Sequence, residues 1–163
     1  MNWYAVYTHP RAEKKIHSEL LKKGIDAYLP LQRTLKLWSD RKKWVEEPLF
    51  KSYIFVKISE SQYFEVLNTP GVVRFITFEG KAVPVPEQQI EAIRYYLSDE
   101  VQPAEFMEKL APGQIVEVMK GPLRGLRGEM VEVSGRHKVK VEISAIGQSI
   151  IVTIPLSQLK VLQ

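Results

Sequence analysis

The residue types that most often carry enzyme chemistry are few and scattered in this chain. None of its 163 residues is cysteine, which excludes disulfides, thiolate metal sites and cysteine nucleophiles. His9 and His17 are eight residues apart and His137 lies in another predicted domain, so the histidines are not spaced as ligands of one metal ion. Glu46 and Glu47 would point to opposite faces of a strand, and no glycine-rich phosphate loop or nucleophile elbow is present. The sequence therefore predicts a protein that is not an enzyme and uses no metal or cofactor.

The most informative stretch lies between Ile115 and Ile143, where alternating apolar and polar residues are interrupted by glycines. The alternation predicts strands with one buried face, and the glycines mark positions of positive φ or of close approach by another segment. The segment between the first two predicted strands resembles the KOW motif of transcription-elongation and ribosomal proteins. The residues that match this motif are Gly121, Pro122, Gly125, Leu126 and Gly128.

The composition is that of an ordinary soluble globular protein, with 45% hydrophobic and 26% charged residues. A formal net charge of +4 permits contact with nucleic acid without requiring it. No apolar run is long enough to cross a bilayer, and the first residues do not form a signal peptide. We therefore expect a cytoplasmic, monomeric protein with no membrane partner.

Periodicity predicts alternating strands and helices in the first hundred residues. Pro10 suits the first turn of a helix, Gly24 suits its end, and Ile16 and Leu20 lie on its core face. Ser59 and Gln62 form a capping box for a short second helix. The other predicted elements are strands at 3–7, 49–56 and 72–78, a long hairpin from 33 to 45 with a basic tip, and a helix that starts at Pro86.

The chain changes character after this helix. Periodicity is lost from Ser98 to Gly113, as is typical of a linker between independent units. Five short strands follow, and their β-branched residues favour a small barrel over a helical hairpin. We therefore predict an α+β fold class: a mostly antiparallel sheet with helices in residues 1–98, a linker at 99–108, and a five-stranded SH3-like β-barrel in residues 109–163.

Six short segments in the first hundred residues occur in an order that is typical of one protein family: Trp3-Tyr4, Gly24, Tyr28-Leu29-Pro30, Pro48-Leu49-Phe50, Tyr53-Ile54-Phe55-Val56 and Pro70-Gly71-Val72-Val73. With these segments and the KOW motif, the whole chain resembles the NusG family of transcription elongation factors, in which an NGN domain precedes a KOW domain. The resemblance implies a bacterial factor that binds the clamp helices of RNA polymerase and suppresses pausing or termination.

An aromatic sheet face is the expected polymerase-binding surface. Tyr53 and Phe55 alternate with Ile54 and Val56, so one pair faces the helices and the other pair faces the opposite side. All four could be core residues, but a sheet covered by helices on one side leaves its aromatic face exposed, which is typical of a surface that binds a partner. The resemblance favours the second interpretation, although Tyr7 and Phe78 fit the core equally well. It implies polymerase contacts from Tyr7, Leu49, Phe50, Tyr53, Phe55 and Phe78.

Basic residues recur at helical spacing along the first predicted helix, at Arg11, Lys15 and Lys22, with Ser18 between them. A basic stripe is usually a solvated surface. In specialised members of the family the matching helix face reads the non-template DNA strand. A solvated surface and a DNA-binding surface are therefore equally supported. The hairpin tip adds three further basic residues, which fit phosphate contacts and a soluble loop equally well: Arg41, Lys42 and Lys43.

The hairpin tip and the segment Glu47-Pro48-Leu49-Phe50 resemble specialised antiterminators of the RfaH and UpxY kind, which act at selected operons. A general housekeeping NusG is the alternative within the family. Ile146-Gly147-Gln148 stands where general factors carry Phe-Gly-Arg, at the site of contact with ribosomal protein NusE or termination factor Rho. Ile146 is the predicted partner-binding residue. An alternative from another class is a KOW protein that binds RNA or the ribosome and never contacts polymerase.

Overall fold

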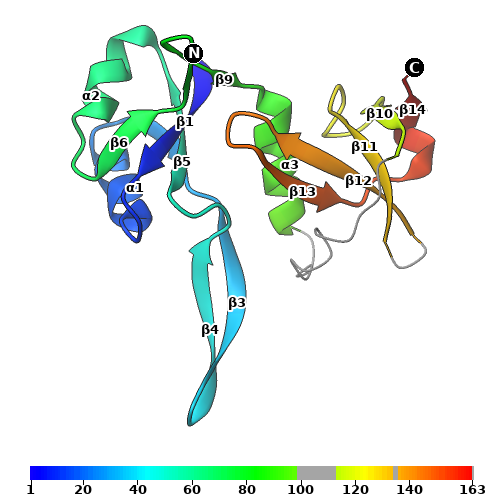
Figure 1. The fold of residues 1–163 in the computed structure, drawn as a ribbon, viewed down its shortest axis with the longest axis horizontal. Coiled ribbons are helices and arrows are strands. Elements are labelled where there is room, and N and C mark those ends of the chain that lie inside the picture. Colours follow the sequence, from blue (N-terminus) through cyan, green and yellow to red (C-terminus); the bar gives the residue numbers. More distant parts are fainter. Residues whose placement is uncertain (99–112, 134–135, 163) are drawn as a thin grey trace. The chain divides into compact units, whose positions relative to one another are not determined.

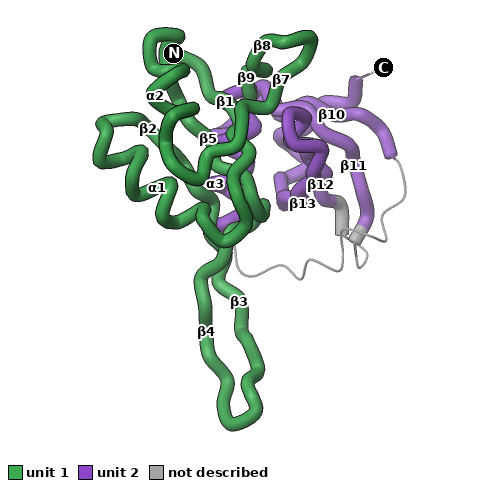
Figure 2. The backbone as a smooth tube through the Cα atoms, turned by 60° about the vertical axis from the view of Figure 1, so that its left-hand side comes forward, with its two compact units in different colours: residues 1–85 green, residues 86–163 purple. Residues whose placement is uncertain are grey.

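The structure, a computed structural model, describes residues 1–98, 113–133 and 136–162. These residues form two compact units, Met1–Val85 and Pro86–Gln163, which Figure 2 distinguishes by colour. Each unit contains its own five-stranded sheet, and every strand pair of these sheets is antiparallel. The predicted α+β fold class is confirmed.

The sheet of the first unit has the strand order β2-β5-β1-β6, and β9 also pairs with β1. Its strands are β1 (Asn2–Thr8), β2 (Asp26–Tyr28), β5 (Tyr53–Ile58), β6 (Val72–Phe75) and β9 (Pro84–Val85). The β1–β5 register places Val6 opposite Ile54 on one face, and Tyr7 opposite Tyr53 on the other. This register decides which side chains enter the core.

The core of the first unit lies between this sheet and the helices α1 (Glu13–Lys22) and α2 (Tyr63–Leu67), the latter preceded by a 3-10 turn, η1 (Glu60–Gln62). Ile16, Leu20 and Val66 from the helices pack with Ile54 and Val56 from β5. Fully burying an aliphatic side chain contributes about 1.5–3 kcal/mol, so this cluster holds the helices on one face of the sheet. The predicted core face of α1 and the capping box, in which Ser59 N–H donates to Gln62 Oε1 at 3.1 Å, are both present.

Two hairpins stand outside the main sheet of the first unit. The strands β3 (Leu31–Trp38) and β4 (Arg41–Pro48) pair along their whole length and project away from the sheet (Figure 1). The strands β7 (Thr77–Phe78) and β8 (Lys81–Ala82) are joined by Glu79 and Gly80. Both turn residues have positive φ (52° and 80°), as a tight hairpin of this twist requires.

The second unit contains α3 (Glu87–Ser98) and five strands in the order β13-β12-β11-β10-β14. The strands are β10 (Ile115–Val118), β11 (Arg127–Val133), β12 (Arg136–Ile143), β13 (Gln148–Val152) and β14 (Leu159–Val161), with a 3-10 turn, η3 (Leu156–Gln158), before the last. Val116, Val118, Val139 and Val141 are buried as the alternation predicts. The segment forms strands, as predicted, and not a helical hairpin.

The helix α3 belongs to the second compact unit, whereas the sequence placed it in the first domain, which was predicted to end at residue 98. Tyr95 Oη donates to the Thr153 carbonyl at 3.1 Å, and Ser144 N–H donates to Gln89 Oε1 at 3.3 Å. These bonds join α3 to the barrel. The apolar periodicity of a helix shows that one of its faces is buried, but it does not show which part of the protein that face packs against. The predicted linker, 99–108, lies outside the described residues.

Candidate functional site

Two tyrosines and an arginine form a cluster on the sheet face opposite the helical core of the first unit. Tyr7 and Tyr53 are cross-strand neighbours, and their rings meet edge to face with centroids 5.6 Å apart. Arg74 of β6 is paired with Tyr7, and its Cζ lies 5.7 Å from the centre of the Tyr7 ring. Both rings are half-buried and Arg74 is exposed. We call these three residues the tyrosine patch.

The other members of the predicted aromatic face lie differently. Phe50 and Phe55 are 3% and 0% exposed, with ring centroids 6.3 Å apart, so these two rings are buried and not part of an exposed aromatic face as expected. Phe55 pairs with the small residue Ala5 of β1, which leaves room above the sheet for its ring. Leu49 is half-buried, and its N–H donates to the Pro30 carbonyl at 2.9 Å. Phe78 is largely exposed but lies on β7, in a separate two-stranded sheet.

A buried carboxylate fixes the turn that precedes Tyr53. Ser52 has a φ of 69°, in the left-handed region, and its N–H donates to Glu13 Oε2 at 3.0 Å. The Ser52 carbonyl accepts from Thr8 N–H at 2.9 Å, which ties the same turn to β1. Glu13 is 5% exposed and lies in the first turn of α1, where a negative charge is favoured by the helix dipole. The sequence pattern did not single out Glu13. Its place shortly after Pro10, near the predicted start of a helix, was the feature that could have indicated a role for this carboxylate.

The basic stripe of α1 is shorter than predicted. Lys15, Ser18 and Lys22 are exposed on the helix, but Arg11 precedes it in a turn with a φ of 66°. The helix begins at Glu13 because the chain turns after β1, where Ala12 N–H donates to the His9 carbonyl at 3.3 Å. Lys22 lies 3.7 Å from a Glu19 carboxylate oxygen, an exposed pair of little energetic weight.

The β3–β4 hairpin carries exposed indole rings among its basic residues. Arg41 Cζ and Lys43 Nζ lie 5.4 Å and 5.3 Å from the centre of the Trp38 ring, and Arg33 Cζ lies 5.3 Å from that of Trp44. Trp38 and Trp44 are 46% and 52% exposed. The sequence predicted the exposed basic tip but not the exposure of these two tryptophans, although a tryptophan on each side of the basic tip segment was the available signal. The three tip residues of the prediction are all exposed: Arg41, Lys42 and Lys43.

Charge is partly balanced at the base of this hairpin. Lys36 Nζ lies 3.2 Å from a Glu47 carboxylate oxygen. A hydrogen bond from Thr34, followed by a hydrogen bond from Lys36, lowers the pKa of Glu47 below its usual value. Glu47 therefore stays negatively charged near neutral pH and compensates Lys36.

The KOW motif shapes the loop between β10 and β11. Gly121 and Gly125 have positive φ (85° and 89°), and Leu126 is buried. Gly128 has a different requirement, since an added Cβ would lie 2.5 Å from Val139 Cγ1 and 2.7 Å from the Lys140 carbonyl oxygen. The motif glycines thus serve both purposes that the sequence predicted, while Pro122 lies exposed in the loop.

The predicted partner-binding residue lies in the turn between β12 and β13. Ile146 is half-buried, and its N–H and that of Gly147 both donate to the Ile143 carbonyl at 3.1 Å. Gly147 has a φ of 65°. The turn is therefore held in one conformation, with the Ile146 side chain partly accessible.

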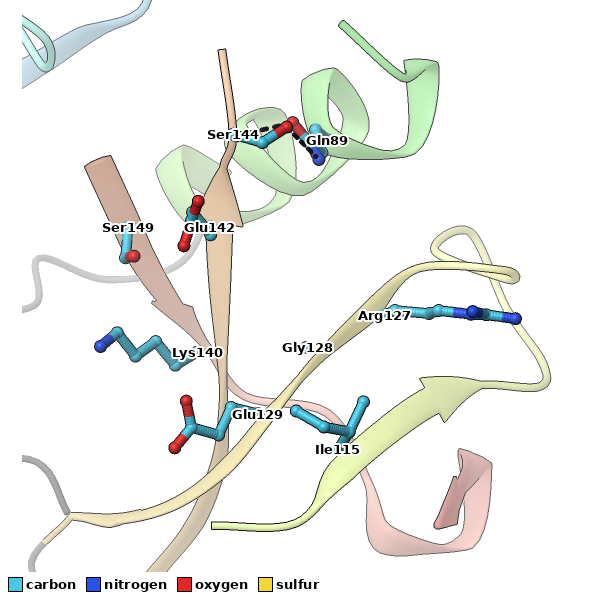
Figure 3. A pocket seen from close by; sticks show the side chains of 9 residues that line it. All are labelled: Gln89, Ile115, Arg127, Gly128, Glu129, Lys140, Glu142, Ser144 and Ser149. Carbon is cyan, nitrogen blue, oxygen red and sulfur yellow. Dashed lines mark hydrogen bonds between the residues drawn. The ribbon is translucent and has the colours of Figure 1, made fainter. Parts of the chain in front are cut away.

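A shallow depression of about 340 Å³ lies on the second unit, where Glu129 and Lys140 face each other across β11 and β12 (Figure 3). Figure 3 also shows Glu142 and Ser149 at its edge and no side chain at Gly128. Positively and negatively charged side chains alternate along its lining, so the depression has no electrostatic potential of one sign that would attract a charged ligand. Among the described residues, no group of three or more histidine, aspartate or glutamate side chains could hold a metal ion.

Comparison with known proteins places the chain in a family. A family model described as the transcription termination factor NusG matches residues 1–94, more than half of the chain. The chain belongs to the NusG family. The match includes the first unit and most of α3, so the matched region extends past the point at which the compact units divide in this structure.

Two curated NusG-family relatives align along nearly the whole chain. The transcription termination/antitermination protein NusG of Streptococcus pyogenes is 25% identical over 96% of this chain and 94% of its own. The protein of the same name from Rickettsia prowazekii is 28% identical over 97% and 88%. A solved structure, "Domain interaction in Thermotoga maritima NusG", covers 99% of this chain and 97% of its own, with 22% identity and a TM-score of 0.53, and so shares the fold. In the part of this NusG-family chain that is described, no helix has the length and apolar character of a membrane span.

Proposed function

We propose that this chain is a bacterial transcription factor that binds RNA polymerase and suppresses pausing or termination. The observation that carries the proposal is the tyrosine patch. Protein interfaces concentrate their binding energy in a few tyrosine, tryptophan and arginine side chains, and the patch presents Tyr7, Tyr53 and Arg74 together, at a turn fixed by Glu13. The names of the curated relatives support the transcriptional role.

The partner surface is the pair of clamp helices of RNA polymerase, as the family resemblance implies. The action needs no bond-making chemistry. A protein that binds only the closed clamp shifts the clamp equilibrium toward closure by its differential affinity for the two states. A clamp held closed resists the opened states that accompany pausing and termination.

Polymerase affinity of the full-length chain tests the proposal. The double substitution Tyr7→Ala with Tyr53→Ala should weaken binding by about 2 kcal/mol or more per tyrosine, if these rings are central to the interface. Phe64→Ala is the matched control, because Phe64 is an exposed aromatic residue on α2, which packs against the opposite face of the sheet. Phe50 is unsuitable, since truncating a buried phenylalanine costs about 3–5 kcal/mol of stability.

The outcomes separate the classes of function. Unchanged affinity of the double variant, with circular dichroism unchanged, would reject the tyrosine patch as the polymerase site. A wild-type chain that captures no polymerase but binds RNA or ribosomes would instead support the alternative of a KOW protein that acts away from polymerase.

We also propose that exposed basic residues of the first unit contact the non-template DNA strand. Lys15 and Lys22 on α1 are exposed, as are Arg11 and the three basic residues of the hairpin tip. Each phosphate contact with a single strand contributes a slope of about −0.7 to the dependence of log affinity on log salt. Lys15→Gln with Lys22→Gln should therefore flatten the salt dependence of DNA binding while leaving polymerase affinity intact. An unchanged slope would make the stripe a solvated surface.

The range of genes served is a separate part of the proposal. The segment Glu47-Pro48-Leu49-Phe50 supports a specialised factor, and the relatives that carry the name NusG support a housekeeping one equally well. Genome-wide occupancy distinguishes the two, since a specialised factor occupies few operons. We further propose that Ile146 contacts ribosomal protein NusE or Rho.

A further inference from the structure

The β3–β4 hairpin exposes large apolar side chains on both of its faces. Its register pairs Leu35 with Trp44 and Leu37 with Lys42 on one face. Trp38 pairs with Arg41 on the other face, where Lys43 also points. Exposed apolar groups of this size on a two-stranded sheet, which is marginally stable alone, indicate a surface that meets a partner.

The chemistry of the Trp38 face selects the partner. A guanidinium and an ammonium group both lie against the Trp38 ring, at 5.4 Å and 5.3 Å from its centre. The Glu47 carboxylate on this face pairs with Lys36 at 3.2 Å, and Asp40 is the one acidic residue between Trp38 and Lys43. With three basic residues against this one carboxylate, the tip keeps a net positive charge. A matching partner presents flat aromatic surfaces flanked by negative charges.

An unpaired nucleic-acid strand has this chemistry. Its bases expose their faces for stacking on aromatic side chains, and its phosphates attract the neighbouring cations. In a duplex the base faces are already stacked on one another, so the Trp38 ring favours an unpaired strand. An apolar protein surface suits the opposite face, where Leu35, Leu37 and Trp44 lie together, better than it suits the Trp38 face.

We propose that the Trp38 face of the β3–β4 hairpin binds unpaired DNA, with a base stacked on the Trp38 indole and Arg41 and Lys43 on the flanking phosphates. On binding, the cations move from the ring to the phosphates, and the ring face that they leave receives the base. The choice of DNA rests on the proposed function, because a factor on polymerase lies near an unpaired DNA strand. Trp38 thus adds base stacking to the phosphate contacts that the basic residues of the tip provide.

The test measures the affinity of the full-length chain for a fluorescent mixed-sequence oligonucleotide of about 12 nucleotides, the order of one single-strand binding site. The strand is supplied as unpaired DNA, as unpaired RNA and as duplex DNA, at several salt concentrations. Trp38→Leu keeps an apolar residue but removes the aromatic face, and Trp38→Phe keeps the face. We expect Trp38→Leu to weaken binding of unpaired DNA about tenfold, equivalent to about 1.4 kcal/mol, without changing the salt slope. Trp38→Phe should retain most of the affinity.

Two further variants separate stacking from charge and one face from the other. Arg41→Gln with Lys43→Gln should flatten the salt slope by about 0.7 for each phosphate that is no longer neutralised. Trp44→Leu, an exposed indole on the opposite face of the same hairpin, is the matched control and should keep the wild-type affinity. Cross-strand NMR contacts of the hairpin show whether each variant keeps its fold.

Four results would overturn the inference: equal binding of duplex and unpaired DNA, tighter binding of RNA than of DNA, unchanged binding by Trp38→Leu, or equal weakening by Trp38→Leu and Trp44→Leu. Loss of polymerase binding by Trp38→Leu with strand affinity intact would also overturn it and make the face a protein-docking surface. Polymerase is absent from the strand-binding assay. Failure of the stacking site and failure of the proposed polymerase contact are therefore distinguishable, since the latter depends on Tyr7 and Tyr53.

Discussion

Gly128 is the position in the KOW motif where an added methyl group has least space. A Cβ built there lies 2.5 Å from Val139 Cγ1 and 2.7 Å from the Lys140 carbonyl oxygen, whereas carbon atoms prefer separations of about 3.5–4.0 Å. Val139 is fully buried, and the Lys140 carbonyl is part of a strand paired to β11. Overpacking of a core costs about 1–3 kcal/mol, and a clash with paired backbone places Gly128→Ala at the upper end, about 3 kcal/mol.

Thermal unfolding of the barrel measures this cost, followed through the NMR amide signals of β11 and β12. For a unit of under 100 residues each kcal/mol lowers the melting temperature by about 4–8 °C, so Gly128→Ala should lower it by about 12–24 °C. Gly147→Ala is the control, because its added Cβ meets no described atom within 4 Å and its φ of 65° costs about 1–2 kcal/mol. A decrease for Gly128→Ala no larger than that of the control would refute the close-approach argument.

Three further predictions concern side chains. Glu13→Ala removes the acceptor of a backbone N–H and should lower the free energy of unfolding in urea by about 1–3 kcal/mol; Glu13→Gln should cost less, and equal decreases would contradict the hydrogen-bond explanation. An NMR titration of Glu47 should give a pKa below that of an ordinary glutamate, because Thr34 and Lys36 favour its charged form, and a pKa above the ordinary value would contradict this. The resulting small stabilisation of the fold is present above the unfolded-state pKa and disappears as the pH falls through the folded-state pKa. Ile146→Ser should weaken capture of NusE or Rho by a folded barrel, and undiminished capture of both would exclude Ile146 from the contact.

Much of the fold could be predicted because local patterns and tertiary packing agree. Ile16 and Leu20 recur on one helix face and are buried there, and the β-branched residues of the barrel alternate in and out as a pleated strand requires. Gly121 and Gly125 adopt the positive φ that their loop positions indicated. In each case neighbours in the sequence determine the conformation.

The errors in the candidate site arise where distant residues decide the outcome. The period of two correctly places Tyr53 and Phe55 on one face, but the small residue at Ala5 lets Phe55 pack down beside Phe50. The helical spacing that includes Arg11 extends past the true helix start, because the turn after β1 has its own hydrogen bonds. The cation–ring contacts of Trp38 depend on the cross-strand register of the hairpin, which alternation alone does not specify.

The same dependence on register connects the fold of the first unit to its proposed function. A slip of β5 by one residue against β1 would turn Tyr53 toward the helices and bring Ile54 to the face where Tyr7 lies. Two bonds oppose this slip at the start of β5, from Ser52 N–H to the buried Glu13 carboxylate and from Thr8 N–H to the Ser52 carbonyl. Glu13 therefore acts on the tyrosine patch without belonging to it. Its loss should weaken polymerase binding by disordering the turn before Tyr53, even though the side chain itself is buried away from any partner.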